Sequence, residues 1–195
     1  MMEFRKGAGA VLKRPAVFID RDGTLNEEVD YLCRPQEAVL TPGAGRAISV
    51  LNERGIPVLV ISNQAGIGKG KFGWKDYESV MHRLDELLAG AGARIDGAYV
   101  CPFHPSAQDD YRHPSHPDRK PNPGMLMRAA REHHIDLANS WMIGDKTIDL
   151  EAGRNAGCRV ALVRTGYGTA TDGALADVVA ANLAEAIEKI LAQWP

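Results

Sequence analysis

The sequence predicts a three-layer α/β fold in which helices cover both faces of a mostly parallel sheet. Short apolar runs alternate along the chain with segments whose apolar residues recur at helical spacing, and this alternation is typical of parallel sheets. Two of the apolar runs lead into an acidic residue, Asp20 and Asp145. The 195 residues are 45% hydrophobic and 25% charged, the profile of an ordinary globular protein. We expect a single domain over residues 15–195 and a flexible tail over residues 1–14.

Each element follows from a local pattern. Apolar runs predict strands at residues 16–19, 57–61, 97–100, 140–143, 159–163 and 177–179. Helical spacing predicts helices at about residues 42–54, 77–88, 124–134, 147–156 and 182–191. We expect Thr41 to cap the first helix and Asn182 the last, while Gly55 and Gly157 each suit the position just after a helix. Residues 101–123 are rich in Pro, His and Asp, and they predict a long loop.

Composition limits the possible partners and the compartment. The formal net charge of −2 argues against a nucleic-acid-binding protein, which would normally carry a basic excess. Cys33, Cys101 and Cys158 are odd in number and far apart, so they do not predict a disulfide framework. No apolar run approaches the roughly 20 residues that span a bilayer. We therefore expect a cytoplasmic protein, a monomer, that binds neither nucleic acid nor membrane.

Polar residues gather where the predicted strands end. Ligands of open parallel sheets bind beyond the carboxyl ends of the strands, and here those ends carry Asp20, Asp22, Ser62, Asn63 and Asp145, while the long loop brings Lys120. A carboxylate such as Asp20 can act as a nucleophile toward phosphorus, and Mg²⁺ held with Asp145 would offset the repulsion between the two anions. Such a set predicts phosphoryl transfer.

The remaining polar residues fit the same reaction. Asp22 can protonate the leaving oxygen and later activate water. Ser62, Asn63 and Lys120 can contact the phosphate oxygens as charge shifts in the transition state.

Four segments then identify a family by resemblance. Asp20-Arg21-Asp22-Gly23-Thr24-Leu25 resembles the first motif of the haloacid dehalogenase superfamily, and Ser62, Lys120 and residues 144–149 match its other three motifs in order. The resemblance extends from about Val17 to Gly166. It implies a Rossmann-like fold of the capless type, because the spacing leaves no room for an inserted cap domain.

Within the superfamily the chain is most similar to the heptose bisphosphate phosphatases, whose relatives include histidinol-phosphate phosphatases. The matching segments are residues 20–26, 30–31, 62–70, 101–102, 119–125 and 144–146. This resemblance implies Mg²⁺-dependent hydrolysis of a small sugar phosphate, D-glycero-D-manno-heptose 1,7-bisphosphate at its 7-position, through an aspartyl-phosphate. Such a reaction belongs to the carbohydrate metabolism that supplies heptose for lipopolysaccharide.

The resemblance also implies residue roles. Asp20 is the nucleophile and Asp22 the acid/base, and Mg²⁺ is held by the carboxylates of Asp20 and Asp145 and by the backbone carbonyl of Asp22. The residues expected to contact substrate are Asn63, Arg119 and Lys146. Lys146 could instead only pair with a neighbouring acid, and Asp149 could serve the site or only the dipole of its helix.

The long loop departs from the family pattern. The family commonly holds a structural zinc there, with ligands in the pattern Cys-x-His and Cys-x-Cys, and the aligned residues here are Cys101, Phe103, His116 and Asp118. Phe103 cannot bind metal, so we expect that the zinc is lost and that packing holds the loop. A remnant zinc site built from Cys101, His104, His116 and Asp118, with His113 nearby, is the alternative.

Three other functions stay open. The first is hydrolysis of histidinol phosphate or of another small phosphomonoester. The second is a non-catalytic phospho-acceptor module, which Asp22 disfavours because such a module keeps its phosphoryl group. The third is a phosphatase acting on nucleic-acid ends, which the acidic balance disfavours.

Overall fold

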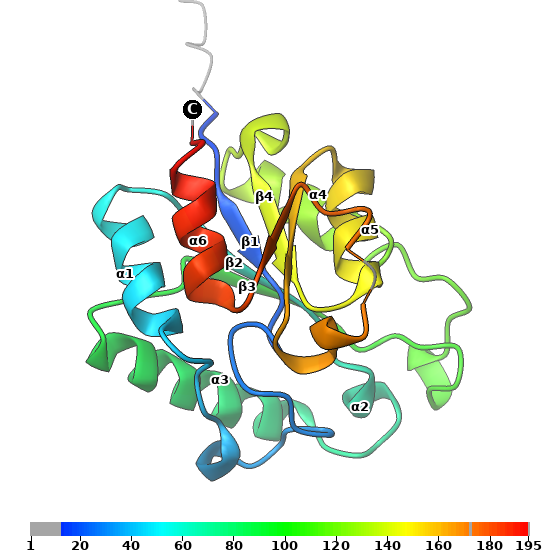
Figure 1. The fold of residues 1–195 in the computed structure, drawn as a ribbon. Helices are drawn as coiled ribbons and strands as arrows, with labels where there is room; N and C mark the ends of the chain where they lie inside the picture. Colours follow the sequence, from blue (N-terminus) through cyan, green and yellow to red (C-terminus); the bar gives the residue numbers. More distant parts are fainter. Residues whose placement is uncertain (1–12, 172, 195) are drawn as a thin grey trace, which may run out of the picture.

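The computed structural model describes residues 13–171 and 173–194, and their centre is a six-stranded, fully parallel sheet in the order β3-β2-β1-β4-β5-β6 (Figure 1). The strands are β1 (Val17–Ile19), β2 (Val58–Asn63), β3 (Gly97–Cys101), β4 (Trp141–Gly144), β5 (Arg159–Val163) and β6 (Val178–Ala180). The predicted three-layer α/β fold is confirmed.

Helices lie on both faces of the sheet. They are α1 (Ala44–Glu53), α2 (Ala65–Gly68), α3 (Trp74–Gly90), α4 (Gly124–Glu132), α5 (Thr147–Ala156) and α6 (Leu183–Leu191), with 3-10 turns η1 (Pro35–Glu37), η2 (Asp109–Tyr111), η3 (Leu137–Asn139) and η4 (Gly166–Thr169). Buried residues of α1, α3 and α6 pack on one face, and those of α4 and α5 pack on the other. In the part of the chain that the structure describes, no helix combines the length and apolar character needed to cross a bilayer.

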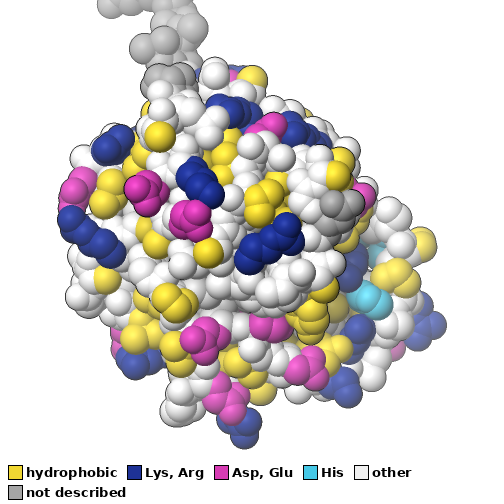
Figure 2. Space-filling model, in the orientation of Figure 1, with side chains coloured by type: hydrophobic (Ala, Val, Ile, Leu, Met, Phe, Trp, Pro, Cys, Tyr) yellow, Lys and Arg dark blue, Asp and Glu magenta, His cyan; other side chains and the backbone are white. Residues whose placement is uncertain are grey.

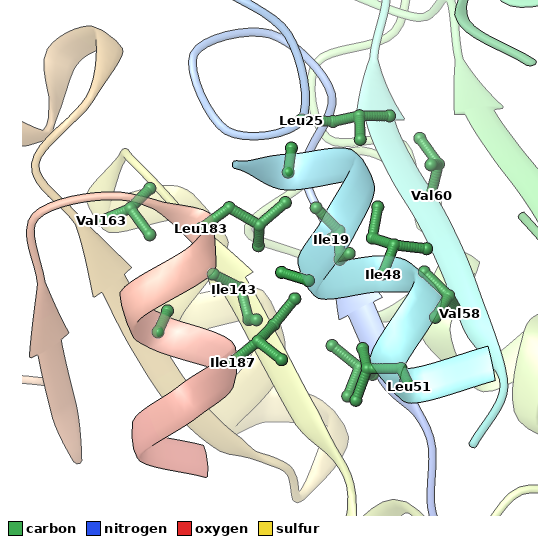
Figure 3. Close-up of a cluster of buried hydrophobic side chains, with 14 of the residues drawn as sticks. Ile19, Leu25, Ile48, Leu51, Val58, Val60, Ile143, Val163, Leu183 and Ile187 are labelled. Carbon is green, nitrogen blue, oxygen red and sulfur yellow. The ribbon is translucent and has the colours of Figure 1, made fainter. Parts of the chain in front are cut away.

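Alternation along the strands creates the two cores. Val17 and Ile19 of β1 point into the first core, whereas Phe18 between them belongs to the second, as the period of two in a strand requires. Figure 3 shows Ile19 among side chains from β2, β4, α1 and α6. Both faces of β1 are therefore covered, which explains why its sequence is continuously apolar.

The order of the strands creates a crevice between β1 and β4. The chain proceeds outward from β1 through β2 to β3, then returns to place β4 on the other side of β1. Ligands bind at such a switch point, outside the carboxyl ends of the strands. Figure 1 shows the loop after β1, α2 and η4 at this same end of the sheet.

The structure corrects one local prediction. Thr41 does not cap α1, because its hydroxyl donates to the Thr24 carbonyl at 2.7 Å and the N-cap is Gly43, with a φ of 76°. Residues 1–12 of the predicted tail lie outside the described residues. Arg14 makes a backbone contact, since its N–H donates to the His134 carbonyl at 3.1 Å.

Charges of both signs are interspersed on the surface. On the face drawn in Figure 2, Lys and Arg side chains alternate with Asp and Glu side chains. This distribution agrees with the small net charge of −2.

Candidate active site

Three carboxylates meet at the crevice between β1 and β4. Asp20 follows β1, Asp145 follows β4, and Asp149 lies in the first turn of α5. All three are buried, and one carboxylate oxygen of each lies within 4.8 Å of the other two. The register pairs Ile19 with Ile143, and this pairing brings the two strand ends to the same level. The predicted meeting of Asp20 and Asp145 is thus present.

A buried lysine partly neutralises this cluster. The Lys120 ammonium lies 2.5 Å from Asp20 Oδ1 and 2.7 Å from Asp149 Oδ1, and it donates to the Ile61 carbonyl at 2.7 Å. Burial alone would lower the pKa of Lys120, but Asp149 and Asp20 outweigh it and raise that pKa. The ammonium thus contacts two of the three carboxylates, and three ionised acids would exceed its single positive charge.

That excess charge disfavours ionisation of the acids. Burial, followed by the charge of Asp149, raises the pKa of Asp20 from 3.8 to about 8. Burial also raises the pKa of Asp145 to about 6, although the nearby Lys146 opposes the shift. Both shifts have the direction expected when anionic groups are taken out of water and placed close together.

The cluster suits a hard divalent cation. Asp145 Oδ1 is buried and has no hydrogen-bond partner, whereas Asp145 Oδ2 accepts from the Tyr167 N–H at 2.7 Å. Mg²⁺ prefers such oxygen ligands, and a cation here would satisfy this oxygen and offset the excess negative charge. Over residues 13–171 and 173–194, this is the one group of three or more acidic, His or Cys side chains with ligand atoms this close together.

Two glycines allow the loops to approach Asp145. A Cβ atom on Gly23, where φ is +82°, would lie 2.5 Å from Asp145 Oδ2. A Cβ atom on Gly166, where φ is +52°, would lie 2.4 Å from the same oxygen. Side chains at these positions would displace the carboxylate, and positive φ itself favours glycine.

Asp22 stands beside the cluster in a dense hydrogen-bond network. Its oxygens accept from Arg21 Nε at 3.0 Å and from Arg21 Nη2 at 2.8 Å. Asn26 Nδ2 donates to Oδ1 at 3.1 Å, and Gln64 Nε2 donates to Oδ2 at 2.7 Å. The Asp22 carboxylate is therefore held in one orientation.

The end of β2 supplies a hydroxyl and an amide. The Ser62 hydroxyl is buried and accepts from Gln64 Nε2 at 2.7 Å. Asn63 bonds reciprocally with the backbone of Lys120: its Nδ2 donates to the Lys120 carbonyl, and its Oδ1 accepts from the Lys120 N–H, both at 3.1 Å. Asn63 thereby fixes the loop that delivers Lys120, a contact absent from the sequence prediction.

A cleft of about 150 Å³ opens beside Asp22. It is lined by Arg21, Asp22, Glu28, Val29, Asp30, Tyr31, Leu32, Asn63, Gln64, Ala65, Gly66 and Lys146. The Lys146 ammonium pairs with Glu28 at 3.1 Å and lies 4.4 Å from the centre of the Tyr167 ring. Lys146 thus borders the cleft and also pairs with a neighbouring acid, and its contact with substrate stays a prediction.

Aromatic packing occupies the loop in which the family commonly holds zinc. The Phe103 ring stacks on His116, with 3.7 Å between ring centroids and 2° between ring planes. Arg119 Nη1 donates to the Phe103 carbonyl at 3.0 Å, which orients Arg119. Cys101 is buried, and burial raises the pKa of its thiol. Zinc loss stays a prediction, although the stack supplies the kind of packing expected in place of a metal.

Sequence reasoning missed part of the site. Arg21, Asn26, Glu28 and Gln64 were not singled out, although Arg21 lies inside the first motif. Asp149 contacts both its own helix and the buried lysine: its Oδ2 accepts from the Lys146 N–H at 3.0 Å at the start of α5, and its Oδ1 pairs with Lys120. The acid in the first helical turn was the signal, but that position alone could not reveal the lysine.

Comparison with known proteins identifies a matching family model and similar proteins. Residues 118–186 match a family model described as HAD-hyrolase-like. The chain is 45% identical over 143 residues, 73% of this chain and 66% of the relative, to D-glycero-beta-D-manno-heptose-1,7-bisphosphate 7-phosphatase of Mesorhizobium japonicum. It is 40% identical to D-glycero-D-manno-heptose-1,7-bisphosphate 7-phosphatase of Thermosynechococcus vestitus, with 92% of this chain and 96% of the relative covered.

A solved structure resembles the fold closely. D,D-heptose 1,7-bisphosphate phosphatase from B. bronchiseptica, complexed with magnesium and phosphate, aligns with a TM-score of 0.83 and 32% identity. The alignment covers 92% of this chain and 99% of that structure.

Proposed function

Because the chain belongs to the haloacid dehalogenase superfamily, and within it to the D-glycero-D-manno-heptose-1,7-bisphosphate 7-phosphatase family, we propose that it removes the 7-phosphate of that sugar bisphosphate through an aspartyl-phosphate on Asp20. Its enzyme class is phosphoric monoester hydrolase. The observation that carries the proposal is the buried cluster of Asp20, Asp145 and Asp149, with Asp22 beside it at the cleft.

The first half of the reaction transfers the phosphoryl group to the protein. The Asp20 carboxylate attacks phosphorus, and the bond between phosphorus and the sugar oxygen breaks. That oxygen takes the electron pair and receives a proton from Asp22. Lys120, 2.5 Å from Asp20, and Ser62 stabilise the charge on the phosphate oxygens.

The second half restores the enzyme. Water attacks the phosphorus of the aspartyl-phosphate, and its proton passes to the Asp22 carboxylate. The bond between phosphorus and Asp20 breaks, and its electron pair returns to the Asp20 carboxylate. Phosphate leaves through the cleft beside Asp22, and Asp22 is again protonated for the next substrate.

The carboxylates of Asp20 and Asp145 and the backbone carbonyl of Asp22 would hold the metal. When bound, Mg²⁺ supplies positive charge that lets the anionic nucleophile and the anionic phosphate come together. The partnerless oxygen of buried Asp145 supports this assignment.

The position of the cleft supports recognition of a sugar-sized substrate. We propose that residues 15–195 form one domain without a cap, so that loops rather than a second domain contact the sugar. Lys146 and Asn63 line the cleft, and the Phe103 carbonyl orients Arg119, which precedes Lys120 in the chain. These residues would bind the sugar hydroxyls and the second phosphate.

The Asp20→Asn variant tests the mechanism. It removes the nucleophile with little change in volume, so we expect turnover to fall by more than about a thousandfold while the circular dichroism spectrum stays that of wild type. Phosphate release should require Mg²⁺ in the wild-type protein. Activity retained by Asp20→Asn would contradict the assignment.

A substrate panel tests the specificity. We expect a heptose 1,7-bisphosphate anomer to exceed histidinol phosphate and fructose bisphosphate by at least about a hundredfold in kcat/KM, roughly 2.7 kcal/mol of transition-state discrimination. A preference of similar size for histidinol phosphate would instead assign the chain to that substrate class.

A further inference from the structure

Arg21 is a buried cation that the proposed reaction does not use. Its side chain is 1% exposed, and a buried charge is costly unless it is paired. Its partner is Asp22, which it contacts through both Nε and Nη2. The centre of the Tyr77 ring of α3 lies 5.6 Å from the guanidinium carbon, within the range of a cation–π contact.

The contacts of Asp22 show what this pairing achieves. Asn26 and Gln64 are both buried, and each donates one hydrogen bond to the Asp22 carboxylate. The Asp22 side chain is 18% exposed, and it lines the cleft beside the carboxylate cluster. Donors from three residues thus fix the carboxylate, which borders the cleft where substrate would enter.

We propose that Arg21 is a positioning residue, which holds the Asp22 carboxyl group at the wall of the cleft for proton transfer to the leaving group. The proposal rests on the proposed phosphatase function. A planar guanidinium binds a carboxylate bidentately and therefore restricts its rotation, which a lysine ammonium does not do. Gln64 extends the network, since its Nε2 lies 2.7 Å both from Asp22 Oδ2 and from Ser62 Oγ.

The step that depends on this positioning is the cleavage of the first bond. As the bond between phosphorus and the leaving oxygen breaks, that oxygen gains the electron pair and takes the proton of the Asp22 carboxyl group. A sugar alkoxide is a poor leaving group and needs this proton. A p-nitrophenolate ion delocalises its charge and leaves without it.

A second role for Arg21 would be to hold only the loop. The Arg21 carbonyl accepts from the N–H groups of Leu25 and Asn26, at 2.9 and 3.0 Å, so residues 20–26 form a compact turn. If the side chain served this turn alone, its loss would disturb Asp20 as well, and kcat/KM would fall equally for every substrate. The dependence on leaving group separates the two roles.

The test compares Arg21→Met and Arg21→Lys with wild type on heptose bisphosphate and on p-nitrophenyl phosphate. The value of kcat/KM reports steps only as far as the first bond cleavage, so it isolates the step in which the leaving oxygen is protonated. We expect Arg21→Met to lose roughly a hundredfold in kcat/KM on the sugar phosphate, within the range of general acid catalysis, and to stay near wild type on p-nitrophenyl phosphate. Arg21→Lys keeps the positive charge but not the planar guanidinium, so its kcat/KM on the sugar phosphate should lie between the values of wild type and Arg21→Met.

A double-mutant cycle with Asp22→Asn completes the test. Because Arg21 is inferred to act through Asp22, Arg21→Met should cost little further activity on the sugar phosphate in the Asp22→Asn background. Equal losses on both substrates, or losses that simply multiply in the double variant, would overturn the inference.

Folding and the underlying function are controlled separately. If Arg21→Met fails to fold by circular dichroism, the ratio of the two substrates in Arg21→Lys decides the question. If wild type releases no phosphate from either substrate with Mg²⁺, the proposed function fails and this inference with it. If wild type is active and Asp20→Asn is not, the proposed function stands. Equal losses of Arg21→Met on the two substrates would then refute only the positioning role of Arg21.

Discussion

At the scale of single residues, Lys120 is the charge on which the site depends. It is buried between Asp20 and Asp149, at 2.5 and 2.7 Å. Removal of one partner from a buried ionic network leaves uncompensated charge, which is far more costly than the loss of an exposed pair. The stability of the protein and the chemistry of its site therefore depend on the same ammonium group.

Lys120→Met should lower the free energy of unfolding by roughly 3–5 kcal/mol, because Asp20 and Asp149 lose their common cation. Urea denaturation without Mg²⁺ measures this change. Lys189→Met is the matched control, since Lys189 pairs with Glu185 on the surface of α6 and should change stability by less than about 1 kcal/mol. Similar effects of the two substitutions would contradict the buried network.

At the scale of elements, η4 supports Asp145. The Tyr167 N–H binds Asp145 Oδ2 at 2.7 Å, and the Thr165 hydroxyl donates to the Gly23 carbonyl at 2.6 Å. Gly166 makes this approach possible, since a Cβ atom there would lie 2.7 Å from the Gly23 Cα. The segment after β5 thus holds the Asp145 carboxylate, which follows β4.

Gly166→Ala should weaken Mg²⁺ binding by roughly 10–100-fold, the range seen when groups that orient a metal ligand are altered. The added methyl group would collide with the Asp145 carboxylate. Isothermal titration with Mg²⁺ measures the affinity. Gly157→Ala is the control, because Gly157 also has a positive φ, of 86°, but has open space around its Cα; this variant should lose stability and keep its Mg²⁺ affinity. Unchanged affinity in Gly166→Ala would show that η4 does not position Asp145.

At the scale of the whole molecule, the carboxylate cluster makes stability depend on pH. The folded-state pKa values of Asp20 and Asp145, about 8 and about 6, exceed the ordinary value of 3.8. Between about pH 4 and about pH 8 these two groups therefore bind more protons in the folded protein than in the unfolded chain, and their contribution to stability falls as pH rises. Mg²⁺ competes with these protons, so its affinity should rise over the same range.

We expect the metal-free protein to lose stability from about pH 5 to about pH 8, and added Mg²⁺ to restore more of it at the higher pH. Urea denaturation with and without Mg²⁺ measures both trends. Asp20→Asn is the control: it removes the group with the larger shift, so its metal-free stability should vary less with pH. A wild-type protein that becomes more stable toward pH 8 without Mg²⁺, relative to Asp20→Asn, would contradict the assignment of these shifts.

Sequence patterns correctly predicted the helix ends that are set by residues adjacent in the chain. Helix α5 begins at Thr147 and ends before Gly157 as predicted, because a left-handed glycine stops the helix whatever lies around it. Asn182 caps α6 as predicted, by accepting from the Glu185 N–H. Thr41 failed as a cap because its hydroxyl found the distant Thr24 carbonyl, and no local rule weighs such a contact.

The candidate reacting groups could be read from the sequence, since motif order and strand ends suffice to place Asp20, Asp22 and Asp145 at one end of a parallel sheet. The contacts that control these groups could not be read. Lys120 reaches Asp20 across 100 positions of the chain, and Arg21 and Gln64 meet on Asp22 only because β1 and β2 are neighbours in register. Local patterns determine secondary structure and chemical type, whereas strand pairing and packing determine distance. Charge interactions depend on distance, so tertiary structure alone decided the ionisation of the cluster and the orientation of its acid.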